Sequence, residues 1–186
     1  MYEMNTRDFG KVAISTALLC ISAWIAIPLA GIPITMQTLV LCLSSALLGW
    51  KKGLFAVLAY LLLGCIGAPV FAGFTGGVGV LLSPTGGYLI GFLPCAFVIG
   101  WAGDRLSNRK RWDTRLFLGL WMGLGVLLCY ALGTAWFVLL TAQESGRVGL
   151  WSALSTCVFP YLPFDCVKIV CAVVIVEKLG EIIKIK

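Results

Sequence analysis

The stretch from Gly64 to Phe92, GCIGAPVFAGFTGGVGVLLSPTGGYLIGF, contains no charged residue, yet glycine and proline interrupt it repeatedly. At membrane depth an unpaired backbone N–H or C=O group is costly, so irregular backbone survives there only where it is buried in protein or lines a polar cavity. The segment therefore predicts a pocket inside a membrane-embedded chain.

Composition supports a membrane environment. Of the 186 residues, 60% are hydrophobic and 12% are charged, and the mean hydropathy is +1.01. A chain of this length with so few polar residues cannot cover the surface of a soluble globule. We expect an all-α integral membrane protein in the lipid bilayer, with residues 1–186 forming a single domain.

Six apolar segments are candidates for transmembrane helices, at about residues 11–30, 37–50, 53–67, 86–103, 115–140 and 150–178. A spanning helix needs roughly 20 apolar residues, and fewer where it packs among other helices. Of the 14 lysines and arginines, 12 flank these segments on one side. Excess basic charge marks the cytoplasmic side, so we expect both termini inside and the Gly-rich loop outside, over the pocket. The same distribution argues against nucleic-acid binding, because the basic residues behind the net charge of +6 lie at the ends of apolar segments and form no continuous binding surface.

Two ionisable residues, Asp165 and Lys168, interrupt the otherwise apolar sequence CVFPYLPFDCVKIVCAVVIV. A spacing of three residues puts both side chains on one face of a helix. Ionisable residues inside a membrane span are costly unless paired and mark a functional site by default. Pro160 and Pro163 disturb the helix beside them and free backbone polar groups. We interpret the pair as part of a ligand cavity, with an ion pair that only fixes the helix as the alternative.

Such a cavity suits a small rigid ligand with both donors and acceptors, since Asp165 accepts N–H bonds and Lys168 donates to a carbonyl or carboxylate. Four aromatic side chains are candidates for its apolar walls: Phe71, Tyr88, Trp151 and Phe164.

Two polar clusters lie on the expected outer side. Thr35 and Gln37 belong to GIPITMQT at 31–38, and Thr85 follows Ser83 and Pro84 just before Tyr88. Their hydroxyl and amide groups are candidates for ligand contacts, and capping of the next helix by Thr35 or Ser83 is the alternative.

The glycines of the outer loop are expected to let it fold back tightly as a lid. Glycine tolerates positive φ and close contact, which favours this role for Gly73, Gly76, Gly77 and Gly79.

Eight cysteines are scattered through the apolar segments without a C-x-x-C pair, and the chain has no histidine. We therefore expect small packing residues, no metal and no cofactor. A phosphate-binding G-x-x-x-x-G-K-[ST] motif is also absent.

Three motifs resemble one family. PITMQ at 33–37, PVFAG at 69–73 and PTGGYLIGF at 84–92, together with Asp165 and Lys168, are similar to the BioY family of biotin-binding S subunits of energy-coupling-factor (ECF) vitamin transporters. The family's usual pattern has glycine directly before Pro84, whereas this chain has Ser83.

The resemblance implies a protein of the bacterial plasma membrane that binds biotin at high affinity from outside and delivers it inward. In this family an acid and a lysine of the last span hold biotin, and Asp165 and Lys168 match them. From the loops we add Thr35, Gln37, Phe71, Gly73, Thr85 and Tyr88 as candidate biotin contacts.

The resemblance also implies partners. Ala13 and Ala17 form a small-x-x-x-small strip in the first apolar segment, and such strips permit close helix approach. In the family a strip of this kind docks on a transmembrane coupling subunit that carries two ATPases. Internal packing is the alternative on spacing alone.

Two other functions stay open from the residues themselves. A self-sufficient secondary carrier for a vitamin-like solute would need an inverted repeat, and none is visible. An intramembrane enzyme would have only Asp165 and Lys168 for acid–base chemistry, so we expect no enzyme.

Overall fold

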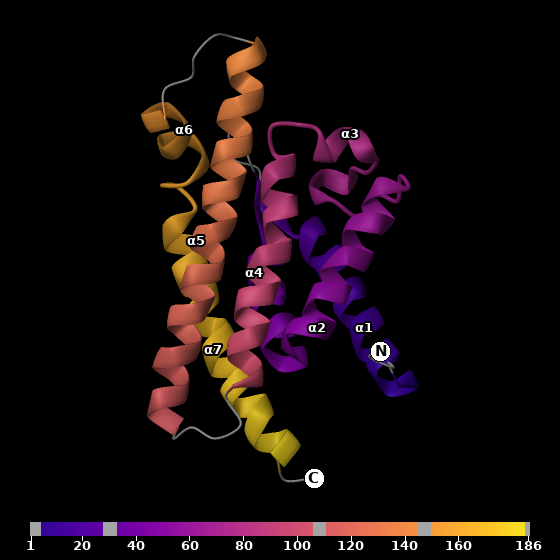
Figure 1. The fold of residues 1–186 in the computed structure, drawn as a ribbon, viewed down its shortest axis with the longest axis vertical. Coiled ribbons are helices and arrows are strands. Elements are labelled where there is room, and N and C mark those ends of the chain that lie inside the picture. The colour runs from indigo at the N-terminus through magenta and orange to yellow at the C-terminus, as the bar shows by residue number, and fades with distance from the viewer. Residues whose placement is uncertain (1–4, 28–32, 106–110, 145–149, 185–186) are drawn as a thin grey trace.

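The computed structural model describes residues 5–27, 33–105, 111–144 and 150–184, and these are mainly helical (Figure 1). The expected all-α class is confirmed. The long helices are α1 (Thr6–Trp24), α2 (Gln37–Cys65), α4 (Gly86–Asp104), α5 (Arg111–Glu144) and α7 (Leu162–Lys184). The short elements are strands β1 (Ala26–Ile27) and β2 (Ile34–Thr35), the 3-10 helix η1 (Ala72–Phe74), and helices α3 (Val78–Leu81) and α6 (Leu150–Cys157).

Helix α2 folds back on itself at Gly49. The backbone there has φ 79° and ψ 171°, a region that is essentially restricted to glycine. Gln37 Nε2 donates to the hydroxyl of Tyr60 over 2.6 Å, although a straight helix would separate these residues by roughly 35 Å. Residues 37–48 and 50–65 are therefore two legs lying side by side. The expected segments 37–50 and 53–67 put the connection after residue 50, whereas the turn lies at Gly49, which tolerates the positive φ.

Three polar contacts join the helices at one end of the bundle, which we call the basic end. They are Lys52 Nζ to Asp8 Oδ1 at 2.6 Å, the backbone N–H of Trp50 to Asp104 Oδ2 at 3.1 Å, and Arg115 Nε to Glu177 Oε2 at 2.5 Å. The start of α1, the turn of α2, the end of α4, the start of α5 and the end of α7 all lie here (Figure 1, bottom). Elements η1, α3 and α6 lie at the opposite end, which we call the loop end.

Helix α4 is in the middle of the bundle because glycines let its neighbours approach closely. A Cβ atom on Gly100 would lie 2.4 Å from the Cα of Trp50 in α2, and one on Gly87 would lie 2.3 Å from the Cβ of Trp136 in α5. Backbone-to-backbone packing over small residues is the usual way that helices associate within a membrane.

By length and composition, three helices of the described part could cross a membrane: Gln37–Cys65, Gly86–Asp104 and Thr114–Thr141. The first of them is long enough only when the two legs of α2 are counted together. A bent pair, Trp151–Cys157 with Leu162–Leu179, qualifies as a fourth span with a 50° bend. A multi-pass membrane protein is thus supported. The expected segments 37–50 and 53–67 are the two legs of α2, and segment 150–178 is broken between α6 and α7; six crossings remain a prediction.

Candidate functional site

A cavity of about 260 Å³ opens among α2, α4, α5 and α7 toward the loop end. Its wall mixes hydroxyl, amide, thiol and apolar side chains with one acid and one lysine. Seven of the residues predicted for the site line it: Thr35, Gln37, Phe71, Thr85, Tyr88, Asp165 and Lys168.

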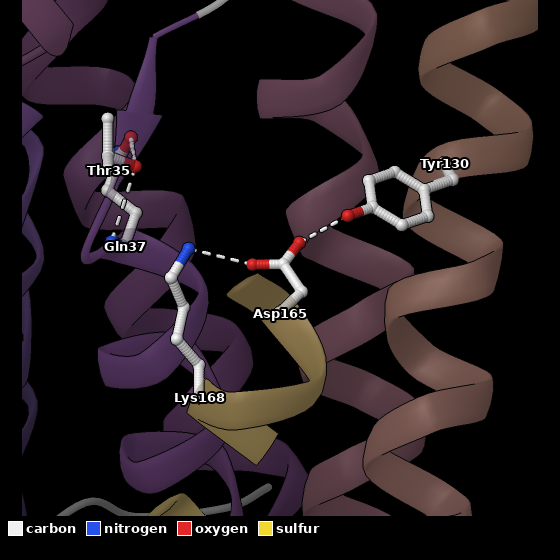
Figure 2. A network of polar contacts seen from close by, with 5 residues as sticks. All are labelled: Thr35, Gln37, Tyr130, Asp165 and Lys168. Carbon is white, nitrogen blue, oxygen red and sulfur yellow. Dashed lines mark hydrogen bonds and ion pairs between the residues drawn. The ribbon is translucent and has the colours of Figure 1, made fainter. Parts of the chain in front are cut away.

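The charged part of the wall is an ion pair on α7. Lys168 Nζ donates to Asp165 Oδ1 over 2.7 Å, and the two side chains are only 11% and 9% exposed. The other carboxylate oxygen, Oδ2, accepts a hydrogen bond from the hydroxyl of Tyr130 on α5 (Figure 2). The prediction that Asp165 and Lys168 share a helix face is confirmed by this contact. Their charges compensate each other, which is the condition for burying ions in an apolar bundle.

The break between α6 and α7 places this pair at the cavity. Residues 158–161 form turns, and α7 begins at Leu162, so Pro163 falls in the first helical turn, where proline removes no helical hydrogen bond. Asp165 also lies in this first turn, where the partial positive charge of the helix N-terminus favours a carboxylate.

A neutral polar group lines the cavity from the start of α2. Thr35 Oγ1 donates to Gln37 Oε1 over 3.0 Å, and Gln37 Nε2 donates to the Tyr60 hydroxyl. Figure 2 shows Thr35 and Gln37 across from the Asp165–Lys168 pair. The backbone N–H of Gln37 also donates to Thr35 Oγ1 at 3.3 Å, so Thr35 takes part in the start of the helix and in the cavity wall.

Helix α4 and the outer loop complete the wall. The Tyr88 hydroxyl lies 3.1 Å from Thr134 Oγ1, and Thr85 Oγ1 lies 3.0 Å from Ser83 Oγ. Phe71 is fully buried and packs edge-on against Tyr60, with ring centroids 5.5 Å apart.

Three predicted residues do not line the cavity. Gly73 is exposed, with φ 70°, and supports the loop turn, while Phe71 and Ala72 reach the cavity in its place. Trp151 is 76% exposed on α6, and Phe164 is exposed on α7. Successive helical residues point about 100° apart, so Phe164 faces away when Asp165 faces inward.

The sequence analysis missed several wall residues, of which Tyr130 matters most. Its phenol lies in the apolar segment 115–140, and a buried phenol needs a hydrogen-bond partner. This rule could have identified Tyr130 from the sequence as a polar residue of the site. Tyr161 and three cysteines also line the cavity: Cys95, Cys129 and Cys157. Within the described ranges, no cluster of three or more His, Cys, Asp or Glu residues is arranged to hold a metal.

The profile of the BioY family matches residues 1–184. The chain belongs to the BioY family. The resemblance drawn from the motifs is thus confirmed.

Similar proteins span the same length. A protein of Thermotoga maritima described as "Biotin transporter BioY" is 42% identical over 176 residues, covering 95% of this chain and 97% of that protein. A protein of Rhodobacter capsulatus with the same description is 36% identical and covers 94% of each chain. These relatives are named transporters, which agrees with the expectation that this BioY protein is not an enzyme.

A solved structure has the same fold. It is described as the S-component for biotin from an ECF-type ABC transporter, and it matches 96% of this BioY chain and 95% of its own at 30% identity, with a TM-score of 0.79.

The contact between Tyr130 and Asp165 predicts coupled mutational effects. Tyr130→Phe removes the hydroxyl and leaves a buried carboxylate oxygen without its donor, which typically costs about 1–3 kcal/mol. In an Asp165→Asn background the same change should cost less, because the charged acceptor is already gone. Unfolding of the four proteins in detergent measures the coupling, which for residues in contact is about 0.5–3 kcal/mol. Additive effects would contradict the hydrogen bond.

Proposed function

We propose that this protein is the biotin-binding S component of an ECF-type ABC importer, which captures biotin from outside and delivers it inward after docking on the energising module. The observation that carries the proposal is the buried Asp165–Lys168 pair facing a cavity of small-molecule size in a BioY-family chain.

The chemistry of the wall suits biotin. Biotin has a cyclic urea with two N–H groups and one C=O, a fused sulfur ring and an aliphatic acid tail. Each Asp165 oxygen has room for a further donor, and the Lys168 ammonium has two N–H bonds beyond the one given to Asp165. We assign to biotin contact the seven lining residues predicted from the sequence, and add Tyr130. Gly73 contributes through the loop turn alone.

We propose that the chain crosses the bacterial plasma membrane six times as one domain, with both termini in the cytoplasm. The grouping of the described basic residues at the basic end, away from the cavity mouth, supports this orientation. The loop end then faces outward, so that η1 and α3 cover the route by which biotin enters.

Ala13 and Ala17 are the proposed contact with the transmembrane coupling subunit and, through it, two ATPase subunits. Both alanines are exposed on α1, whereas Val12 and Thr16 are buried against the bundle. Thr16 Oγ1 donates to the Ala56 carbonyl on α2, which fixes the rotation of α1. This burial pattern favours docking over the internal packing that spacing alone left open.

Asp165→Asn should weaken biotin binding at least a hundredfold. Asparagine keeps the shape but removes the charge-assisted hydrogen bonds to the ligand, each worth about 1.5–3 kcal/mol, and every 1.4 kcal/mol is tenfold in affinity. Calorimetric titration of the purified protein measures the effect. Asp8→Asn is the matched control, because Asp8 bonds Lys52 at the basic end, far from the cavity. Equal affinities for a folded Asp165→Asn variant and the control would remove Asp165 from the site.

Ala13→Trp or Ala17→Trp should leave biotin binding intact and abolish ATP-dependent uptake with the coupling partners, because a bulky ring excludes a closely packed helix. Leu127→Trp, at a position 57% exposed on α5, is the control for a large side chain facing lipid. Loss of biotin binding together with uptake would mark the two alanines as packing residues. Unimpaired uptake would place the partner surface elsewhere.

Labelling of single cysteines tests the orientation. In a background without the eight native cysteines, Leu82→Cys at the loop end should react with a membrane-impermeant thiol reagent in intact cells. Arg7→Cys at the basic end should react only after the cells are opened. Both positions are exposed. The reverse pattern would put the cavity mouth in the cytoplasm.

A further inference from the structure

An aromatic cluster at the basic end joins α4 to α5. Trp101 stacks at a tilt on Trp121 with ring centroids 4.9 Å apart, and Phe117 packs on Trp121 at 5.9 Å. Leu116 and Leu120, each one position earlier on α5, are 69% and 73% exposed. The cluster thus borders an apolar surface that, in a membrane protein, faces lipid.

Arg105, which follows α4, lies over the Trp101 ring of this cluster. Its guanidinium carbon lies 3.9 Å from the centre of the Trp101 ring, and the residue is exposed. The neighbouring acid, Asp104, accepts the backbone N–H of Trp50. Among the described residues, Arg105 has no carboxylate partner, and the indole N–H groups of Trp101 and Trp121 have no acceptor. One guanidinium and two indole N–H groups therefore belong to a single aromatic cluster at the end of a membrane bundle.

A cation and two N–H donors suit a ligand that carries a negatively charged, hydrogen-bond-accepting oxygen group. Contact with the Trp101 ring restricts the Arg105 side chain, and a planar guanidinium binds phosphate oxygens with two parallel N–H bonds. Tryptophan N–H groups at the ends of membrane spans typically meet the headgroup region. Exposed Leu116 and Leu120 suit acyl chains, which a free phosphate lacks. The excess of basic residues at this end favours a headgroup with net negative charge.

We propose that Arg105, Trp101 and Trp121 form a binding site for the phosphate headgroup of an anionic phospholipid, whose acyl chain lies along Leu116 and Leu120. The site is built from the ends of α4 and α5 that lie away from the cavity mouth. It shares no residue with the cavity wall, so substitutions here leave the proposed biotin contacts in place.

Native mass spectrometry of the purified full chain tests the site, with phosphatidylglycerol and phosphatidylcholine of identical acyl chains added at equal concentration. The intact protein should retain phosphatidylglycerol preferentially. Arg105→Gln should weaken that binding about fivefold, the usual contribution of one basic residue at a membrane surface. Arg105→Lys should restore part of it, since it keeps the charge without the planar fork. Trp101→Leu should also weaken it.

Lys178→Gln is the matched control. It removes the same charge from an exposed position on α7 at the same end. Biotin affinity serves as the folding check and should be unchanged in every variant. Equal retention of the two lipids by the intact protein would overturn the proposal, as would equal losses in Arg105→Gln and Lys178→Gln.

Discussion

A buried ion pair sets the arrangement of this bundle. Asp165 and Lys168 are nearly inaccessible in helices that are otherwise apolar, and either charge alone would be too costly to keep there. The pair lies on one helix, yet one carboxylate oxygen takes its donor, Tyr130, from another. The hydrogen bond from Tyr130 to the Asp165 carboxylate therefore helps to fix how α7 lies against α5. The break before Leu162 then lets α7 begin at the level where this contact is possible.

Contacts within the protein orient two polar groups of the cavity wall. On one side Tyr130 bonds Asp165, and on the other Tyr60 bonds Gln37, so both of these wall groups are oriented by a tyrosine from a different helix or helix leg. A site whose side chains are already fixed loses less conformational entropy on binding than a flexible one. Such an arrangement suits the proposed binding of biotin, a small and rigid molecule. The loop above the cavity contributes Phe71, whose ring is anchored on Tyr60.

The two ends of the molecule have different chemistry. The loop end combines short helices and turns with the cavity mouth, and the basic end collects ion pairs, arginines and tryptophans. Helix α1 runs between them with Ala13 and Ala17 exposed and with Ser15 and Thr16 buried against the bundle. The proposed sites for biotin, for the coupling subunit and for a lipid headgroup therefore lie on separate surfaces of the molecule.

The sequence by itself determined the features that depend on composition or on one helix. Apolar content indicated a helical membrane protein, the motifs indicated the BioY family, and a spacing of three residues was enough to pair Asp165 with Lys168, because helical periodicity fixes neighbours on the same helix. Most of the other predicted cavity residues were found because they belong to short polar or family-like motifs at the loop end, which are visible in the sequence.

Only the tertiary structure decided which helices meet. Tyr130 reaches Asp165 across 35 positions of sequence, and Gln37 reaches Tyr60 across 23, so neither contact leaves a periodic signal. The position of the turn in α2 depended on the backbone at Gly49. Of the neighbouring loop residues Phe71 and Gly73, both predicted for the site, Phe71 lines the cavity and Gly73 does not. Contacts between helices depend on how their surfaces interlock, and periodicity along one helix does not encode that match.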